Sequence, residues 1–503
     1  MDSSGSNVAG DDAARTTTPS DSVNSLGPVF EDTPPRLRFT IGPCPHKFPP
    51  ADAPGFISSI DDALARHAGA DAQVESLEIS LVFAAPYKIY LTSLGTYATE
   101  HPHAALIKAH HIRAWLRYGM ARAAKSFVLE VPPPCPPLPK NEAIVLDLPA
   151  SAAAVTMALT LGNATLNLPA PAEASFHALT DLLLSNARIA DGDRLGELLS
   201  SPSFPCLKRL RLQYLPGLTE QELAFDELEE LTIVTARDLQ CLVVHAQCMR
   251  TLCVTDCPSL ESANGELAIV APALQALTCA NICSFQPGLQ FSARSVREIG
   301  ELPLWTHGHQ NEASRNQASI YILKHCGDAL HRLHLHLHVP LSMRDYLDSG
   351  IVDFKSILVE EIPKLPNITA LTITISTWSG HSYAASLARL IAQCVNLEEL
   401  HIDVRRDSAK PACSDEACIC NKEGGWENQD FSLERLRNLD IAGVQGLDYE
   451  DRLLQMMLAG APAIKKFKLP PSLGQAYETF LPANSRGRWI TCGDGVYRWT
   501  PNE

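Results

Sequence analysis

The chain has 503 residues, of which 41 are basic and 57 acidic, giving a formal net charge of −16; 46% are hydrophobic and 6% aromatic. This length is too great for one compact core and the composition too apolar for a disordered chain, so we expect two or three domains or one extended repeat body. The negative charge argues against non-specific binding to nucleic acid or to an anionic membrane, since both need a basic surface.

The N-terminal segment predicts a soluble protein of the cytoplasm or nucleus. It is acidic where a secretory signal would be basic and then apolar, and the sequence has no run of about 18 apolar residues. The 15 cysteines are then expected to be reduced thiols and not a disulfide framework. Residues 1–35 are expected to form a disordered tail, because their few apolar side chains cannot offset chain entropy.

The folded body is expected to begin near residue 36. Residues 37–41 alternate between polar and apolar, and residues 56–68 have the spacing of an amphipathic helix. Because a stack of repeats must shield its terminal cores, we expect this helix at one end and residues 470–500 at the other to act as caps.

One phrase, apolar-x-x-apolar-x-apolar, recurs along almost the whole chain. Clear copies begin at Leu207, Leu228, Met249, Leu274, Leu330, Ile368, Leu397, Leu436 and Ile464. Weaker copies begin at Val74, Ala124, Leu161 and Leu179. The steps from residue 207 to 228, 249 and 274 are 21, 21 and 25 residues long, which is the period of a leucine-rich repeat.

Each copy predicts a short strand whose last two apolar residues point into the body, while the residue between them points the other way. The predicted strands, all parallel in one curved sheet, cover about residues 207–212, 228–233, 252–254, 274–279, 333–337, 371–375, 398–404, 436–441 and 464–469. Helices are expected between strands, at residues 194–199 and 384–391. The predicted fold is an α/β leucine-rich-repeat solenoid, with the sheet on its concave side and helices and loops on its convex side. A doubly wound α/β domain is the alternative, and would show continuous apolar strands at wider spacing.

One cluster of cysteines and one row of histidines contain residue types that bind metals, but we predict a metal site at neither. Cys413, Cys418 and Cys420 have no fourth ligand close by, and we expect the surrounding loop, residues 409–429, to be disordered. The segment His334-Leu-His336-Leu-His338 places three collinear histidines on the exposed face, where they cannot easily close a tetrahedron. We therefore predict a polar recognition row there, and no metal or cofactor.

The cysteines of adjacent repeats are expected to be small core residues, with Cys257 bonded to a turn. The sequence contains no Gly-rich phosphate loop, no His-Glu-x-x-His and no Gly-x-Ser-x-Gly. Three common classes of enzyme therefore have no starting motif, and we predict a non-enzymatic protein.

Several longer segments resemble plant F-box proteins with leucine-rich repeats. The segments similar to the repeat part are residues 115–119, 125–130, 176–182 and 205–212. The segments similar to the F-box-associated FBD region, which closes many of those proteins, are residues 418–420, Trp426, 433–441, 448–451 and 461–469. This resemblance implies a solenoid over residues 36–395 and FBD-like C-terminal repeats with a cap over residues 396–503.

In that family an F-box precedes the repeats and docks onto the adaptor of a cullin-RING ubiquitin ligase. Residues 1–35 have no Leu-Pro-Asp-Asp-like opening, paired leucines or Arg-Trp ending, so we do not expect this chain by itself to bind the adaptor. The resemblance then implies a protein-interaction module like the substrate-recognition part of a ligase receptor, without its docking element.

The concave face is the predicted binding site for a protein partner. Outward residues on successive strands, about 4.8 Å apart, would form one patch. These residues are Arg209, Arg211, Glu230, Thr232, Thr251, Arg332, His334, His336, Thr372, Glu399, His401 and Asp440. Basic groups gather at the Arg209 and Arg332 strands and acidic groups at the later strands, which predicts a bipolar face.

Two alternatives to a protein-binding module stay open. One is a receptor for a small hormone-like molecule, which would need a deep apolar pocket with a few convergent polar groups, whereas a broad open face favours a protein partner. The other is a decayed paralogue without function.

Overall fold

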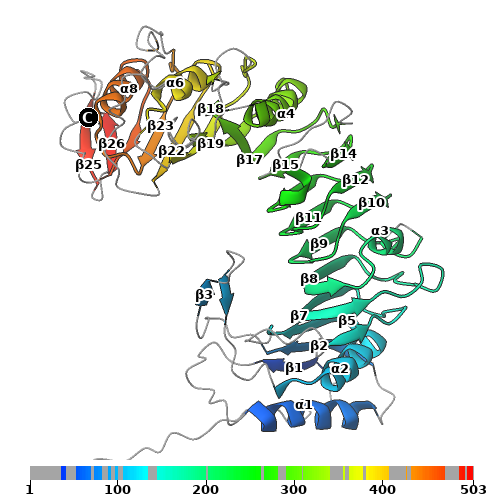
Figure 1. Ribbon diagram of the computed structural model, residues 1–503. Helices are drawn as coiled ribbons and strands as arrows, with labels where there is room; N and C mark the ends of the chain where they lie inside the picture. Colours follow the sequence, from blue (N-terminus) through cyan, green and yellow to red (C-terminus); the bar gives the residue numbers. More distant parts are fainter. Residues whose placement is uncertain are drawn as a thin grey trace, which may run out of the picture.

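The structure is a computed structural model, and Figure 1 shows a C-shaped molecule with its N- and C-terminal parts at opposite ends of the curve. The residues described are 36–40, 53–68, 73–81, 89–91, 97–99, 106–133, 144–199, 202–261, 265–280, 291–308, 310–339, 355–356, 362–377, 381–406, 426, 432–470, 487–492 and 496–501. The expected disordered tail and the expected disordered loop at residues 409–429, apart from Trp426, lie outside these residues.

One sheet of 18 strands follows the whole curve. Its strands pair in chain order and run parallel, until β26 and β25 close the last edge in antiparallel fashion. The N-terminal strands are β1 (Arg36–Thr40), β2 (Val74–Ser80), β5 (Ala123–Val131), β6 (Val145–Asp147), β7 (Thr156–Asn167), β8 (Asp181–Ile189) and β9 (Arg209–Gln213). The central strands are β11 (Glu230–Val234), β13 (Thr251–Thr255), β15 (Ala276–Cys279), β17 (Glu298–Trp305) and β19 (Arg332–Val339). The C-terminal strands are β21 (Ala370–Thr377), β22 (Glu399–Arg406), β23 (Asn438–Ala442), β24 (Lys466–Lys468), β25 (Gly487–Thr491) and β26 (Val496–Pro501).

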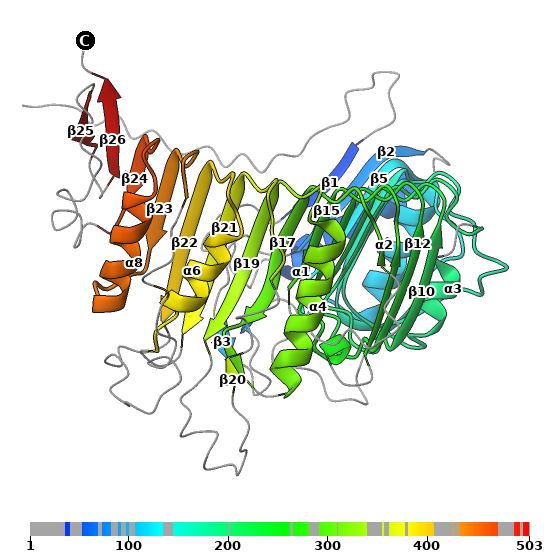
Figure 2. The ribbon, with the colours of Figure 1, turned by 90° about the horizontal axis from the view of Figure 1, so that it is seen from above.

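A second layer covers the outer side of this sheet (Figures 1 and 2). Its helices are α2 (Ala109–Arg122), α3 (Arg194–Leu198), α4 (Gln310–Cys326), α6 (Ala384–Ala392) and α8 (Asp448–Ala459). In the middle of the curve the outer layer is a parallel sheet of four strands, β10 (Glu220–Phe225), β12 (Cys241–Ala246), β14 (Glu266–Val270) and β16 (Phe291–Ser292). The expectation of only helices and loops on the convex side is therefore wrong in this region.

Smaller elements complete the described chain. Helix α1 (Ala53–Ala68) lies at the N-terminal end of the curve and packs on α2, as expected of a cap. Two antiparallel pairs, β3 (Ile89–Leu91) with β4 (Tyr97–Thr99) and β18 (His307–Gly308) with β20 (Lys355–Ser356), form sheets of their own. None of the described helices is long and apolar enough to cross a membrane.

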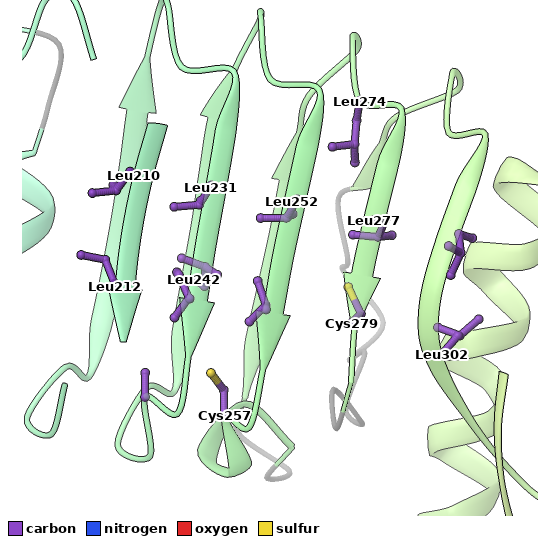
Figure 3. Packing of buried hydrophobic residues seen from close by; sticks show 14 of the residues in the cluster. Leu210, Leu212, Leu231, Leu242, Leu252, Cys257, Leu274, Leu277, Cys279 and Leu302 are labelled. Carbon is purple, nitrogen blue, oxygen red and sulfur yellow. The ribbon is translucent and has the colours of Figure 1, made fainter. Parts of the chain in front are cut away.

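The core lies between the two layers and consists mainly of leucine side chains in register. Leu210, Leu231, Leu252 and Leu277 are direct neighbours on consecutive strands, and each is fully buried. Figure 3 shows this ladder, with Leu242 of the outer sheet packed behind it. A side chain at this position removes its apolar surface from water only because a neighbouring strand lies on each side.

The expected strands form and lie parallel in the one sheet, with boundaries shifted by at most two residues. The first apolar residue of each phrase lies before its strand and is buried in the turn; examples are Leu207, Leu228 and Met249. The weak copy at Leu161 is misplaced, because the part of β7 in register with β5 begins at Thr156. Helix α1 begins three residues before the expected Phe56.

Candidate partner-binding surface

The inner face of the main sheet is defined by the side chains that alternate with the buried leucines. All of the expected site residues lie on this face, and each is exposed or half-buried. In the described part of the chain, the helices of the outer layer and the four-stranded sheet lie on the opposite side (Figure 1). The inner face therefore presents a mainly polar surface over strands β2 to β23, with a group of aliphatic side chains on β5, β7 and β8.

The expected site residues fall into two groups on this surface. The first group is on β9 and β11, where Arg209 is in register with Glu230 and Arg211 with Thr232. The second group is on β19, β22 and β23, where the members are Arg332, His334, His336, Glu399, His401 and Asp440. Four strand spacings, or about 19 Å, separate β11 from β19, so the structure does not bring the two groups together.

Each basic side chain of the two groups has a carboxylate on an adjacent strand, but only Arg209 is closely paired. Arg209 makes a hydrogen-bonded ion pair with Asp181 of β8. Arg211 has a looser pair with Glu230, with 3.9 Å between the charged atoms. Arg332 in the second group is likewise 3.9 Å from Glu298. The basic side chains of the expected bipolar face therefore have acidic neighbours, closely at Arg209 and loosely at Arg211 and Arg332.

The histidines of β19 are held by hydroxyl groups of β21. His334 Nε2 lies 3.0 Å from Thr374 Oγ1, and His336 Nε2 lies 2.7 Å from Ser376 Oγ. Burial lowers the pKa of both imidazoles below the usual value, although the Glu301 carboxylate acts in the opposite direction. Burial therefore favours the neutral form of both rings, and the row contributes hydrogen-bonding groups more than charge.

An aromatic stack that sequence analysis missed extends this histidine row. The ring of Trp305, on β17, stacks on His338 with centroids 4.8 Å apart, and His338 stacks on His336 at 4.1 Å. Trp305 is half-buried on the inner face. Strand β17 has no clear copy of the repeated phrase, so the sequence pattern did not place Trp305 on a strand.

Strand β17 is irregular next to this stack. Its pairing with β19 shifts between Ile299 and Leu302, and Glu301 at this bulge has a φ of 54°. A non-glycine residue in this conformation is strained, and bulges commonly redirect a side chain. The Glu301 carboxylate at this bulge raises the pKa of His334 and His336, against the larger effect of their burial.

At the C-terminal end of the surface, His401 and Asp440 are adjacent. Their Nδ1 and carboxylate atoms are 3.5 Å apart, and Lys468 Nζ lies 3.4 Å from the same carboxylate. Glu399 accepts a hydrogen bond from Asn438 at 3.2 Å. These strands carry paired charges, as the N-terminal strands do.

The cysteines divide between core and surface. Cys257 is buried and its thiol donates to the Thr255 carbonyl at 3.3 Å, as expected of a turn residue. Cys279 is also buried, whereas Cys253 is half-buried on the inner face and Cys248 is exposed. Within the described ranges, no group of three or more His, Cys, Asp and Glu residues could hold a metal ion; the loop with Cys413, Cys418 and Cys420 lies outside them.

The pockets fall into two classes by size and lining. A mainly apolar pocket beside Tyr383 and Leu453 holds about 20 Å³, and another between Met157 and Phe204 also holds about 20 Å³. Two larger pockets, at the amino-terminal ends of the inner strands, measure about 400 and 530 Å³, and Arg297 and Glu298 line both. A volume of 20 Å³ accommodates no more than about one water molecule.

Comparison with family models, curated proteins and solved structures found no match to this chain.

Proposed function

We propose that the chain is a leucine-rich-repeat solenoid of the F-box/FBD type that binds a protein partner on its inner face and performs no catalysis. The observation that carries this proposal is the broad, mainly polar inner face of the parallel sheet, which continues over strands β2 to β23 while the described helices lie on the other side. A broad face of alternating charged, hydroxyl and aromatic side chains suits a protein surface. Recruitment of a ubiquitin ligase is an implication of the family resemblance alone.

The hollows favour this proposal over the small-molecule alternative. Pockets for small ligands usually measure about 300 to 1,000 Å³ and are mainly apolar. The apolar pockets described here hold only about 20 Å³, while the pockets of about 400 and 530 Å³ have charged side chains in their lining, Arg297 and Glu298 in both. This combination supports a macromolecular partner.

The test begins with a partner isolated by affinity purification from the native tissue. The double change Arg211→Glu with His334→Glu alters both groups of the inner face without touching the core. We expect it to weaken binding by about tenfold or more, since burying a like or unpaired charge in an interface costs 2 kcal/mol or more. Isothermal titration calorimetry with the purified partner measures the change.

A matched control places the same charge changes on the outer layer. His245 on β12 and Arg294 after β16 are both exposed, so His245→Glu with Arg294→Glu changes the net charge equally. This control should bind the partner as the wild type does. If the inner-face variant folds normally and keeps its affinity, the partner binds elsewhere.

A further inference from the structure

A stripe of aliphatic side chains crosses the inner face at strands β5, β7 and β8. Val128, Ala158 and Leu183 are direct neighbours in register and are all half-buried. Other aliphatic side chains on this face stand between polar ones, as Val234 does between Gln213 and Thr255. We call Val128, Ala158 and Leu183 the aliphatic stripe.

A hollow of about 190 Å³ lies over the aliphatic stripe. It exists because Ala158 ends at Cβ between the longer Val128 and Leu183. The buried Phe127, Met157 and Leu182 lie below it, and the polar residues on its border are Thr156, Asp181, Arg209 and Arg211. The volume is below that of about 300 Å³ typical for small-molecule pockets, but it can take one or two aliphatic side chains of a larger partner as anchors.

Opposite charges mark the two ends of the stripe. Glu78 is in register with Val128 at one end, and Arg211 with Leu183 at the other. Glu78 is engaged by Arg38 at 2.8 Å and its side chain is 34% exposed. Arg211 is 53% exposed, and its guanidinium is 3.9 Å from Glu230. A carboxylate of a partner could therefore bind Arg211 at a shorter distance and with better hydrogen-bond geometry than Glu230 does. The available charge at this site is therefore positive.

From these contacts we propose that the aliphatic stripe anchors an extended segment of the partner protein in which one or two aliphatic residues lie next to Asp or Glu. The aliphatic side chains occupy the hollow over Ala158, and the carboxylate binds Arg211. Leu183 and Arg211 are on adjacent strands about 4.8 Å apart, so the acidic residue lies one or two positions from the anchor in an extended segment. This inference rests on the proposed function, since it places the partner on the inner face.

The test uses a phage-displayed library of random twelve-residue peptides, selected on the full chain. We expect the selected peptides to share an aliphatic residue followed or preceded within two positions by Asp or Glu. A synthetic peptide of the selected sequence is then titrated against the variants by fluorescence anisotropy. Ala158→Trp fills the hollow, and Leu183→Gln is a second variant that removes aliphatic surface without adding bulk.

Each variant has a distinct expected effect on this peptide. Ala158→Trp, Leu183→Gln and Arg211→Glu should each weaken binding by about tenfold or more, as truncation of an anchor does, whereas His334→Glu should leave the affinity within about twofold, because His334 lies more than four strands away. Repeating the selection on Arg211→Glu should replace Asp and Glu in the peptides by Lys or Arg. Unchanged thermal unfolding of each variant establishes that it is folded.

The negative results of this experiment distinguish a failure of the inference from a failure of the proposed function. Peptides insensitive to Ala158→Trp and Leu183→Gln but sensitive to His334→Glu would overturn the stripe and leave the inner face as the binding surface. Peptides insensitive to every inner-face variant would contradict both. A library that yields no peptide specific to the chain would overturn the stripe as a site for a linear segment and leave a folded partner for the inner face.

Discussion

The residues that follow strands β9, β11 and β13 adopt the left-handed backbone conformation although none is glycine. Tyr214, Thr235 and Asp256 have φ values of 53°, 56° and 53°. They occupy equivalent positions, where the chain leaves the inner sheet, and the Tyr214 and Thr235 amides still donate to the next strand, to Val234 and Thr255, at 2.9 Å. The pairing between strands therefore holds these residues in a conformation that costs roughly 1–2 kcal/mol each.

Thr235 is the most strained of the three, because its side chain is β-branched. Thr235→Gly should raise the free energy of unfolding by about 0.5–1 kcal/mol. Glycine removes the steric cost of the left-handed conformation, and its greater conformational entropy in the unfolded state offsets only part of that stabilisation. Urea unfolding followed by circular dichroism measures this. Thr232→Gly, within the same strand, is the control and should be destabilising; equal losses from both changes would contradict the strain at Thr235.

At the residue scale, the sequence predicted which side chains face outward but not what they contact. The alternation of His334 and His336 with leucines determines their side of the sheet, because strand side chains alternate. Their partners Thr374 and Ser376, and Trp305 that stacks on His338, lie on other strands. Which residues become partners depends on register, which the lengths and shapes of the intervening loops determine. The same reason explains why the pairing of Arg209 with Asp181 was not expected.

At the scale of elements, a buried charge network joins α6, β22 and α8. Glu450 Oε2 accepts backbone N–H groups of Gln445, Gly446 and Leu447 at 2.9, 3.0 and 3.1 Å. Glu450 Oε1 accepts the Tyr383 hydroxyl at 2.7 Å and also binds Arg406. The side chains of Arg406 and Glu450 are only 9% and 3% exposed, so neither charge can be stabilised by water if its partner is lost.

Glu450→Gln should therefore lower the free energy of unfolding by about 3–5 kcal/mol, because it leaves the Arg406 guanidinium buried without a counter-charge. The double change Glu450→Gln with Arg406→Met should recover part of this loss, since it removes the unpaired charge. Chemical unfolding of the two single variants and the double variant gives the coupling energy. The exposed Glu434→Gln is the control; a loss of similar size there, or additive losses in the cycle, would contradict the network.

The four-stranded outer sheet was not predicted, and its sequence explains why. In β10 the inward position 221 is glutamine, which is buried and donates to the Gly192 carbonyl at 2.8 Å. This polar residue interrupts the apolar alternation that would mark a strand. The strands of this sheet have two to six residues, and such short apolar runs do not distinguish strand from helix. The helices at residues 194–198 and 384–392, in contrast, were predicted from their periodicity.

At the scale of the molecule, the order of strands makes the structure a linear stack, in which each strand of the main sheet contacts only the strands next to it. From β1 to β24, the strands of the main sheet lie side by side in the order in which they follow one another along the chain. The sheet also continues without a break from β21 to β22. These two strands lie on either side of residue 395, where the sequence analysis places the end of the solenoid and the start of the FBD-like repeats. Stability in such a structure is close to a sum of terms between neighbours, so a local change should have local consequences.

Leu252→Ala tests this property at the centre of the curve. Leu252 is fully buried between Leu231 and Leu277, so the change should cost about 2–5 kcal/mol by loss of apolar burial and creation of a cavity. Hydrogen exchange followed by mass spectrometry should then show the largest loss of protection in β11, β13 and β15, decreasing towards β2 and β23, because distant strands share no contact with the cavity. Thr251→Ala, on the inner face of the same strand, is the control and should leave protection almost unchanged. An equal loss of protection along the whole sheet would instead mean that the molecule unfolds as one cooperative unit, in which the arms of the curve depend on each other.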